Sequence, residues 1–174
     1  MTSKTPKKII SYREPDHFYF LQCATVATPR DKDWYKRIRE EKYALKRYIQ
    51  YLDFQEKEKN GYRWFDIKPV NEECTRWTGT LVSHGYQFDI ELVLKDTYPY
   101  IPPAARVPVL IDYTDRKLDD EILGLRICDM HMEQNYWWNE FCSLALYLKR
   151  EVSFWFQGVL VTCLRQGYFK EWHT

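Results

Sequence analysis

Cys128 is the residue of this sequence whose surroundings point most directly to chemistry. It follows a short apolar run in the stretch LGLRICDMHM and stands in front of Asp129 and His131. A free cysteine has a pKa near ~8.5, so a small fraction is thiolate at neutral pH, and thiolate is a strong nucleophile. The neighbouring residues leave three interpretations open: a packed thiol, a metal ligand or a nucleophile.

The other cysteines bear on this choice. The chain has five, an odd number without regular spacing, so we predict no disulfide framework and a reducing, cytoplasmic location. A zinc site built from Cys128, His131 and Cys142 would lack the paired short spacings that structural zinc prefers, so we predict no metal and no cofactor. A structural role is expected for four thiols: Cys23, Cys74, Cys142 and Cys163.

Length and charge limit the function further. The 174 residues fit one domain, and 45% of them are apolar, enough for a core. The 26 basic and 25 acidic residues give no global positive field, so a nucleic-acid partner is not expected. No stretch approaches the ~20 apolar residues of a membrane span, and the start lacks a secretory signal. We predict a partly flexible amino-terminal extension over 1–27 and one catalytic domain over 28–174.

An amphipathic helix is expected from Thr28, which can cap it, with Pro29 in its first turn. Its apolar face would carry Trp34, Ile38, Leu45, Ile49 and Leu52. Its other face is basic, with Lys36, Arg37, Arg39, Lys42, Lys46 and Arg47. Such faces usually only keep a helix solvated. The sharper hypothesis is that Arg37, Arg39, Lys42 and Lys46 form a docking face for an acidic partner segment.

Strands are expected after the Asn60-Gly61 turn. A short aromatic strand ends at Pro69, TRWTGTLVS forms a second, and a tight turn at His84-Gly85 leads to YQFDIELVL, whose apolar and polar residues alternate. Three prolines in the next turn forbid a helix, so a stiff extended link would reach a fourth strand at roughly 104–110.

The remainder is expected to be a loop followed by helices. Residues 111–138 have no periodicity and hold Cys128, as in a long packed loop. From Asn139 a helical stripe returns, which we expect Gly158 to end or bend before a last short helix. The predicted fold is α+β: an amino-terminal helix, a four-stranded antiparallel meander, a long active-site loop and carboxy-terminal helices.

Several of these stretches together resemble ubiquitin-conjugating enzymes. RWTGTLVSHGYQFDIELVLKDTYPYIPP is similar to that family's central block, and Ile127-Cys128 stands where the family has an Ile-Cys, with Trp137 and Trp138 about nine residues on. The branch that it resembles most is that of the ubiquitin-fold modifier 1 conjugating enzymes. TPRDKDWYKRIREEKYALKRYI, ECTRWTG, YQFDIE, TYP and the Gly124-x-x-Ile-Cys approach carry this resemblance.

The resemblance implies a fold and an activity. The fold would be ubiquitin-conjugating-enzyme-like, with Tyr98 and the prolines around it turning the chain under the cysteine loop. Cys128 would accept a ubiquitin-like modifier from an activating enzyme as a thioester and pass it to a substrate lysine in a ufmylation-type pathway, with a ligase as a further partner. The docking face of the first helix would bind the activating enzyme.

The family's His-Pro-Asn, whose asparagine stabilises the oxyanion, does not occur in this chain. The modifier 1 branch has a Thr-Ala-Lys in that region, where this chain has Thr114 and Lys117 in YTDRK. Candidates for the oxyanion donor are His131, Asn135, Thr114 and backbone N–H groups near Cys128. The alternative function is a non-catalytic variant of the same fold that acts as a protein-binding scaffold.

Overall fold

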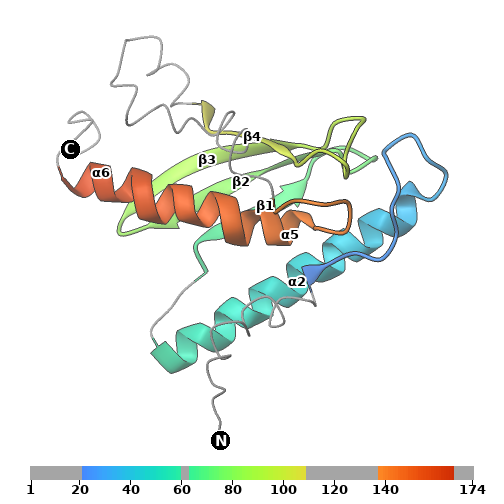
Figure 1. Cartoon of the computed structure of the whole chain (residues 1–174). Helices are drawn as coiled ribbons and strands as arrows, with labels where there is room; N and C mark the ends of the chain where they lie inside the picture. The colour runs from blue at the N-terminus through green and yellow to red at the C-terminus, as the bar shows by residue number, and fades with distance from the viewer. Residues whose placement is uncertain (1–20, 60–62, 109–136, 167–174) are drawn as a thin grey trace, which may run out of the picture.

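Four antiparallel strands form one sheet in the computed structural model, which describes residues 21–59, 63–108 and 137–166, the side chains of 56–59 excepted. Their order in the sheet is their order in the chain: β1 (Phe65–Pro69), β2 (Arg76–Ser83), β3 (Tyr86–Val93) and β4 (Ala104–Arg106). The expected meander is therefore confirmed (Figure 1). The fourth strand is shorter than the predicted 104–110, and Pro108, which has no N–H to donate, follows soon after its end.

The hairpin of β2 and β3 buries one face, because apolar and polar residues alternate along β3. Leu81 of β2 pairs with Phe65 on one side and Phe88 on the other, and all three are buried. Polar side chains at Gln87 and Asp89 face away from the core. The turn at His84 and Gly85 has positive φ at both residues, which matches the right-handed twist of the flanking strands.

The first helix, α2 (Trp34–Lys59), begins later than the sequence indicated. Residues 28–33 are turns instead, because the carboxylate of Asp31 accepts the N–H of Thr28 while the carbonyl of Thr28 accepts the N–H of Asp31. Short acidic side chains close such turns in competition with a helix. Pro29 therefore lies in a turn, and the prediction that it starts the helix is wrong. Residues 21–27 run against the body, with Leu21, Cys23 and Ala27 buried.

The carboxy-terminal helix is one continuous run of residues from Leu144 to Arg165. It comprises α5 (Leu144–Tyr147), two π-helical stretches, η2 (Leu148–Val152) and η3 (Phe154–Leu160), and α6 (Val161–Arg165). Ser143 caps it by accepting the N–H of Leu146. The predicted start at Asn139 is therefore wrong, Phe141 lies before the helix, and Gly158 lies within η3 rather than ending it.

Both helices pack on the same face of the sheet (Figure 1). Tyr48 of α2 stacks on Phe65, with ring centroids 5.5 Å apart, and Phe156 of η3 packs edge-on against Phe88 at 6.1 Å. Because Phe65 and Phe88 share one cross-strand row through Leu81, the two helices cover one side. None of the helices in the described ranges is long and apolar enough to cross a membrane.

Gly79 of β2 lies opposite Ile67 of β1, at a place where no side chain fits. A Cβ there would lie 1.8 Å from the carbonyl oxygen of Asp66 and 2.7 Å from the Cα of Ile67, both backbone atoms. We therefore expect Gly79→Ala to lower the free energy of unfolding by about 3 kcal/mol or more, the upper range for overpacking, in urea titrations.

Gly158→Ala is the matched control, because the nearest atom to its added Cβ is a ring carbon of Phe154 at 3.7 Å. It should raise the free energy of unfolding by about 0.5–1 kcal/mol through the loss of backbone entropy in the unfolded chain. Equal effects of the two substitutions would contradict the register of β1 on β2.

Candidate functional site

The predicted catalytic residues all lie in the part of the chain that the structure does not describe. Cys128, His131, Asn135, Thr114 and Lys117 fall within residues 109–136. Their roles stay predictions. What the structure describes is the framework on either side of this segment, β4 before it and Trp137 after it, and one surface groove on α2.

A buried ion pair forms the centre of this framework. The guanidinium Nε of Arg37 donates to Oε2 of Glu41 at 2.9 Å, one helical turn away, and both side chains have 0% exposure. Burial alone would lower the pKa of Arg37, but the charge of Glu41, together with Tyr98 and Cys23, outweighs it and the pKa lies above the ordinary value. The prediction that Arg37 belongs to the exposed docking face is therefore wrong.

Arg37 binds three backbone carbonyls from two separate parts of the chain. Its Nη1 donates to the carbonyls of Thr25 at 2.8 Å and Glu140 at 2.7 Å, and its Nη2 donates to the carbonyl of Cys142 at 2.7 Å. With Glu41 accepting from Nε, each nitrogen of the guanidinium has a partner. The side chain thereby ties the amino-terminal segment to the residues just before α5.

Glu41 extends the same network to the turn between β3 and β4 that contains Pro99, Pro102 and Pro103, which we call the proline turn. Its Oε2 also accepts the hydroxyl of Tyr98, and its Oε1 accepts the backbone N–H of Leu144 at 2.8 Å, one of the free donors at the start of α5. Burial, followed by the charge of Glu41, holds the pKa of Tyr98 well above its ordinary value, so its hydroxyl stays a donor. The predicted structural role of Tyr98 is thus explained.

A sequence signal for this network existed. Arg37, Glu41, Ala44 and Tyr48 recur at spacings of four, three and four, which is one stripe of a helix, and all four are buried. Two opposite charges at i, i+4 within such a stripe can be buried together, whereas a cation without a partner is rarely buried.

Glu40 anchors the amino-terminal segment beside this network. Its carboxylate accepts the backbone N–H groups of Ala24 and Thr25 and the hydroxyl of Thr25, at 2.7–2.9 Å. Burial would raise the pKa of Glu40, but these hydrogen bonds outweigh it and the pKa lies below the ordinary value. The charged form of Glu40 therefore holds residues 24 and 25 on α2.

The proline turn is joined to the residues after the undescribed segment. Nε1 of Trp138 donates to the carbonyl of Pro99 at 2.7 Å, and the Trp138 ring lies 5.9 Å from the Tyr98 ring and 6.2 Å from that of Tyr147. Trp137 and Trp138 are partly buried and both pack against the core. They fix the point at which the chain returns from the segment that carries Cys128.

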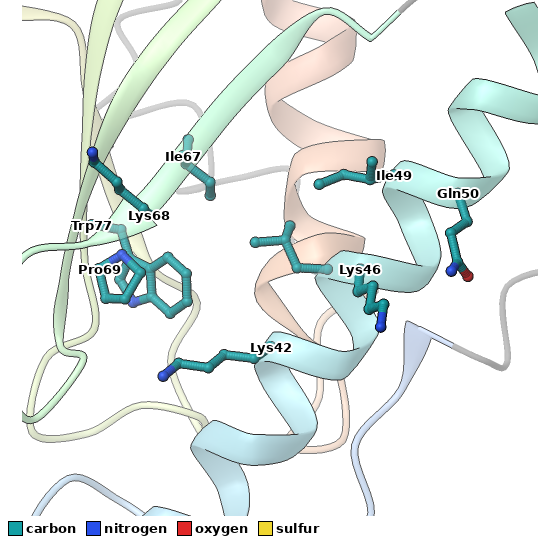
Figure 2. Close-up of a pocket in the computed structure, with 9 residues that line it drawn as sticks. Lys42, Lys46, Ile49, Gln50, Ile67, Lys68, Pro69 and Trp77 are labelled. Atoms are coloured by element: carbon teal, nitrogen blue, oxygen red, sulfur yellow. The ribbon is translucent and has the colours of Figure 1, made fainter.

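The candidate docking face lies along a groove between α2 and β1. This basic groove has a volume of about 390 Å³ and an apolar floor. The floor consists of Leu45, Ile49, Ile67, Pro69 and Trp77. Figure 2 shows Lys42 and Ile49 reaching from α2 toward β1, where Ile67 and Pro69 face them.

The charges around the basic groove have one sign. Lys42 and Lys46 from α2 and Lys68 from β1 line it, and among the described residues no carboxylate does. A second hollow of about 350 Å³ shares Lys42 and continues along α2 to Arg39, but Glu72 and Glu73 also line it, so its charges are mixed. Arg39, Lys42 and Lys46 are exposed, so three of the four predicted docking residues are available to a partner.

None of the four described cysteines has the surroundings of a reactive thiol. Cys23, Cys74 and Cys142 are buried and Cys163 is partly buried. Burial is the main cause that raises the pKa of Cys23 and of Cys142, which favours the unreactive thiol. Within the described residues no group of His, Cys, Asp and Glu could hold a metal ion.

We expect Arg37→Leu to lower the free energy of unfolding by about 3–5 kcal/mol, because it leaves the carboxylate of Glu41 buried and unpaired. Arg30→Leu is the control: Arg30 pairs with Asp96 at the surface, with side chains 79% and 67% exposed, and should cost about 1 kcal/mol or less. Urea titrations of both variants measure the difference, and equal midpoints would contradict the role of the Arg37–Glu41 pair.

Comparison with known proteins identifies a family whose match includes the elements described above. A family model described as "Ubiquitin-fold modifier-conjugating enzyme 1" matches residues 19–150, which is more than half of the chain. The chain belongs to this family. The match includes α2, the meander and the start of the carboxy-terminal helix, so the ubiquitin-conjugating-enzyme-like α+β fold expected from the sequence is confirmed.

Individual relatives agree with the family model. Proteins described as "Ubiquitin-fold modifier-conjugating enzyme 1" match from Branchiostoma floridae (38% identity over 91 residues; 49% of this chain and 50% of the relative) and Anopheles gambiae (34% over 109 residues; 60% and 59%). The chain thus spans between half and two thirds of the length of these relatives. A solved structure named "Novel Ubiquitin-Conjugating Enzyme" aligns at 16% identity over 75% of this chain and 98% of its own, with a TM-score of 0.28, too low for an argument.

Proposed function

We propose that this chain is a conjugating enzyme that carries a ubiquitin-like modifier as a thioester on Cys128 and passes it to a substrate lysine, in a ufmylation-type pathway. The observation that carries the proposal is the family match, which runs from residue 19 to residue 150 and so includes Cys128. The activating enzyme, the modifier, a ligase and a substrate protein are the proposed partners, and the cytoplasm, where thiols stay reduced, is the proposed location.

Loading of Cys128 requires access more than acid–base help. The thiolate of Cys128 attacks the carbonyl carbon of the thioester that joins the modifier to the activating enzyme. A new carbon–sulfur bond forms, the old one breaks, and the activating enzyme leaves as a thiolate. Because one thiolate replaces another, the step is nearly balanced, and its rate depends on how well the two sulfur atoms are brought together.

Transfer to lysine is the harder step. The neutral amine attacks the thioester carbonyl, a tetrahedral oxyanion forms, and Cys128 leaves as the thiolate while the nitrogen loses a proton. A preorganised donor to the oxyanion is typically worth about 2.7–4 kcal/mol. In the absence of His-Pro-Asn we propose His131, Asn135, Thr114 or nearby backbone N–H groups as donors, with Asp129 or His131 as the proton acceptor and Lys117 in a supporting role.

We propose the basic groove and Arg39 as the docking surface for the activating enzyme. An apolar floor flanked by Lys42 and Lys46 of α2 and Lys68 of β1 suits an acidic segment with apolar residues on one side. Lys42 and Lys46 lie on successive turns of α2, so both can contact one such segment. Arg37, one of the residues expected there from the sequence, is excluded by its burial.

Cys128→Ser tests the proposed nucleophile. With activating enzyme, modifier and ATP, the wild-type chain should form an adduct that reducing thiols remove, whereas the serine variant should form either none or an oxyester that resists them. Cys163→Ser, at the partly buried thiol of α6, should load like the wild type. Non-reducing gels measure both.

A thiol-labile adduct on the Cys128→Ser variant would show that another cysteine is loaded. Absence of any adduct on the wild-type chain, together with slow alkylation of Cys128 in the native protein, would support the scaffold function instead.

Reversal of the groove charges tests the docking surface. Lys42→Glu/Lys46→Glu should raise the KM for the activating enzyme roughly tenfold, which is about 1.4 kcal/mol, and leave kcat and the melting temperature close to wild type. Arg76→Glu/Lys95→Glu is the matched control, since both residues are exposed and lie outside the groove. Loading rates against activating-enzyme concentration give both constants, and equal KM values for the two double variants would exclude this surface.

A further inference from the structure

Trp137 marks one end of the segment that carries Cys128. It is the first described residue after 109–136 and comes nine residues after Cys128 in the sequence. Two consecutive residues of η2 hold its ring. Nε1 of Trp137 donates to Oε1 of Glu151 at 2.8 Å, and the guanidinium carbon of Arg150 lies 5.1 Å from the ring centroid.

Glu151 is unusual because it is a carboxylic acid that lies almost completely buried in the carboxy-terminal helix. It is only 8% exposed, and its one hydrogen-bond donor among the described residues is Trp137. Burial is the main cause that raises its pKa, opposed by the hydrogen bond from Trp137. Because a buried carboxyl with one donor contributes little to stability, and an apolar side chain would pack as well, its presence needs a second explanation.

Trp137 has further contacts with Trp138 and Cys142. Its ring packs edge-on against Trp138, with centroids 5.7 Å apart, and Trp138 is hydrogen-bonded to Pro99 of the proline turn. The carbonyl of Trp137 also accepts a weak hydrogen bond from the thiol of buried Cys142. Ring and backbone of Trp137 are thereby held between η2 and the proline turn, and Glu151 supplies the directional contact that sets the ring orientation.

We infer that Glu151 is a positioning residue for the conjugation reaction: through its hydrogen bond to Trp137 it fixes the end of the segment that bears Cys128. The inference rests on the proposed function and adds to it a residue outside that segment. Its physical basis is the sensitivity of a transfer reaction to geometry, since a displacement of about 1 Å at the reacting atoms can cost up to ~10²-fold in rate.

The test compares two substitutions at one position under single-turnover loading. Glu151→Leu removes the acceptor, whereas Glu151→Gln keeps a neutral oxygen that can accept from Trp137. We expect the leucine variant to load with kcat reduced roughly tenfold and with KM for the activating enzyme unchanged, and the glutamine variant to stay within about twofold of wild type. The Lys42→Glu/Lys46→Glu variant should instead raise KM and leave kcat unchanged.

A purely structural role of Glu151 predicts a different result. It would lower the melting temperature of the leucine variant without changing kcat well below that temperature, and a folded leucine variant that loads at the wild-type rate would therefore overturn the inference. A glutamine variant as slow as the leucine variant would overturn it too. If Glu151→Leu does not fold, Trp137→Phe, which loses only the donor and keeps a ring against Arg150 and Trp138, should give the same loss of kcat.

A second readout separates this inference from the proposed function. The alkylation rate of Cys128 by iodoacetamide, followed by mass spectrometry, requires no activating enzyme. It should change at least threefold in Glu151→Leu and remain near wild type in Glu151→Gln. Unchanged alkylation in both would overturn the positioning role, whereas a wild-type chain that never forms an adduct would overturn the conjugating activity alone.

Discussion

The buried pair of Arg37 and Glu41 is the interaction on which the arrangement of the other elements depends. Two opposite charges with no exposure are stable only when their remaining hydrogen-bonding groups are used. Here the partners are the carbonyls of residues 25, 140 and 142, the Tyr98 hydroxyl and the first N–H of α5. The buried charges are therefore stable only when α2, residue 25, Tyr98 and residues 140–144 come together at one place.

This requirement also connects the chain before residues 109–136 with the chain after them. The proline turn, held through Tyr98, leads into β4, and the residues at 137–144 lead into the carboxy-terminal helix. Hydrogen bonds from Trp138 to Pro99 and from Leu144 to Glu41 connect these two regions directly. The basic groove lies on the other edge of α2, toward β1, so a partner bound there leaves this framework free.

The sequence predicted the sheet better than the helix boundaries, for physical reasons. Alternation over Tyr86–Val93 and the His84-Gly85 turn are local signals that tertiary contacts do not override, and the hairpin was therefore predicted correctly. The start of α2 was predicted too early because Asp31 closes a turn on Thr28. In sequence such a turn resembles a helix cap, and in the structure it competes with the helix. Gly158 did not end the last helix because packing of Phe156 and Leu160 continues across it. The i, i+4 pairing of Arg37 with Glu41 is compatible with burial, but the carbonyls of residues 140 and 142 that complete its hydrogen bonds lie more than a hundred positions away and leave no local signal.

Those long separations also determine when the molecule can be completed. The carbonyls of Glu140 and Cys142 lie 103 and 105 residues after Arg37. On the ribosome, α2 and the whole meander are synthesised before either carbonyl exists, so Arg37 has no means of being buried with its full set of partners. Contacts of such separation form late and slowly. A nascent chain that stops short of residue 142 is therefore left with an open core around this guanidinium, which makes premature termination products natural targets for chaperones and proteases.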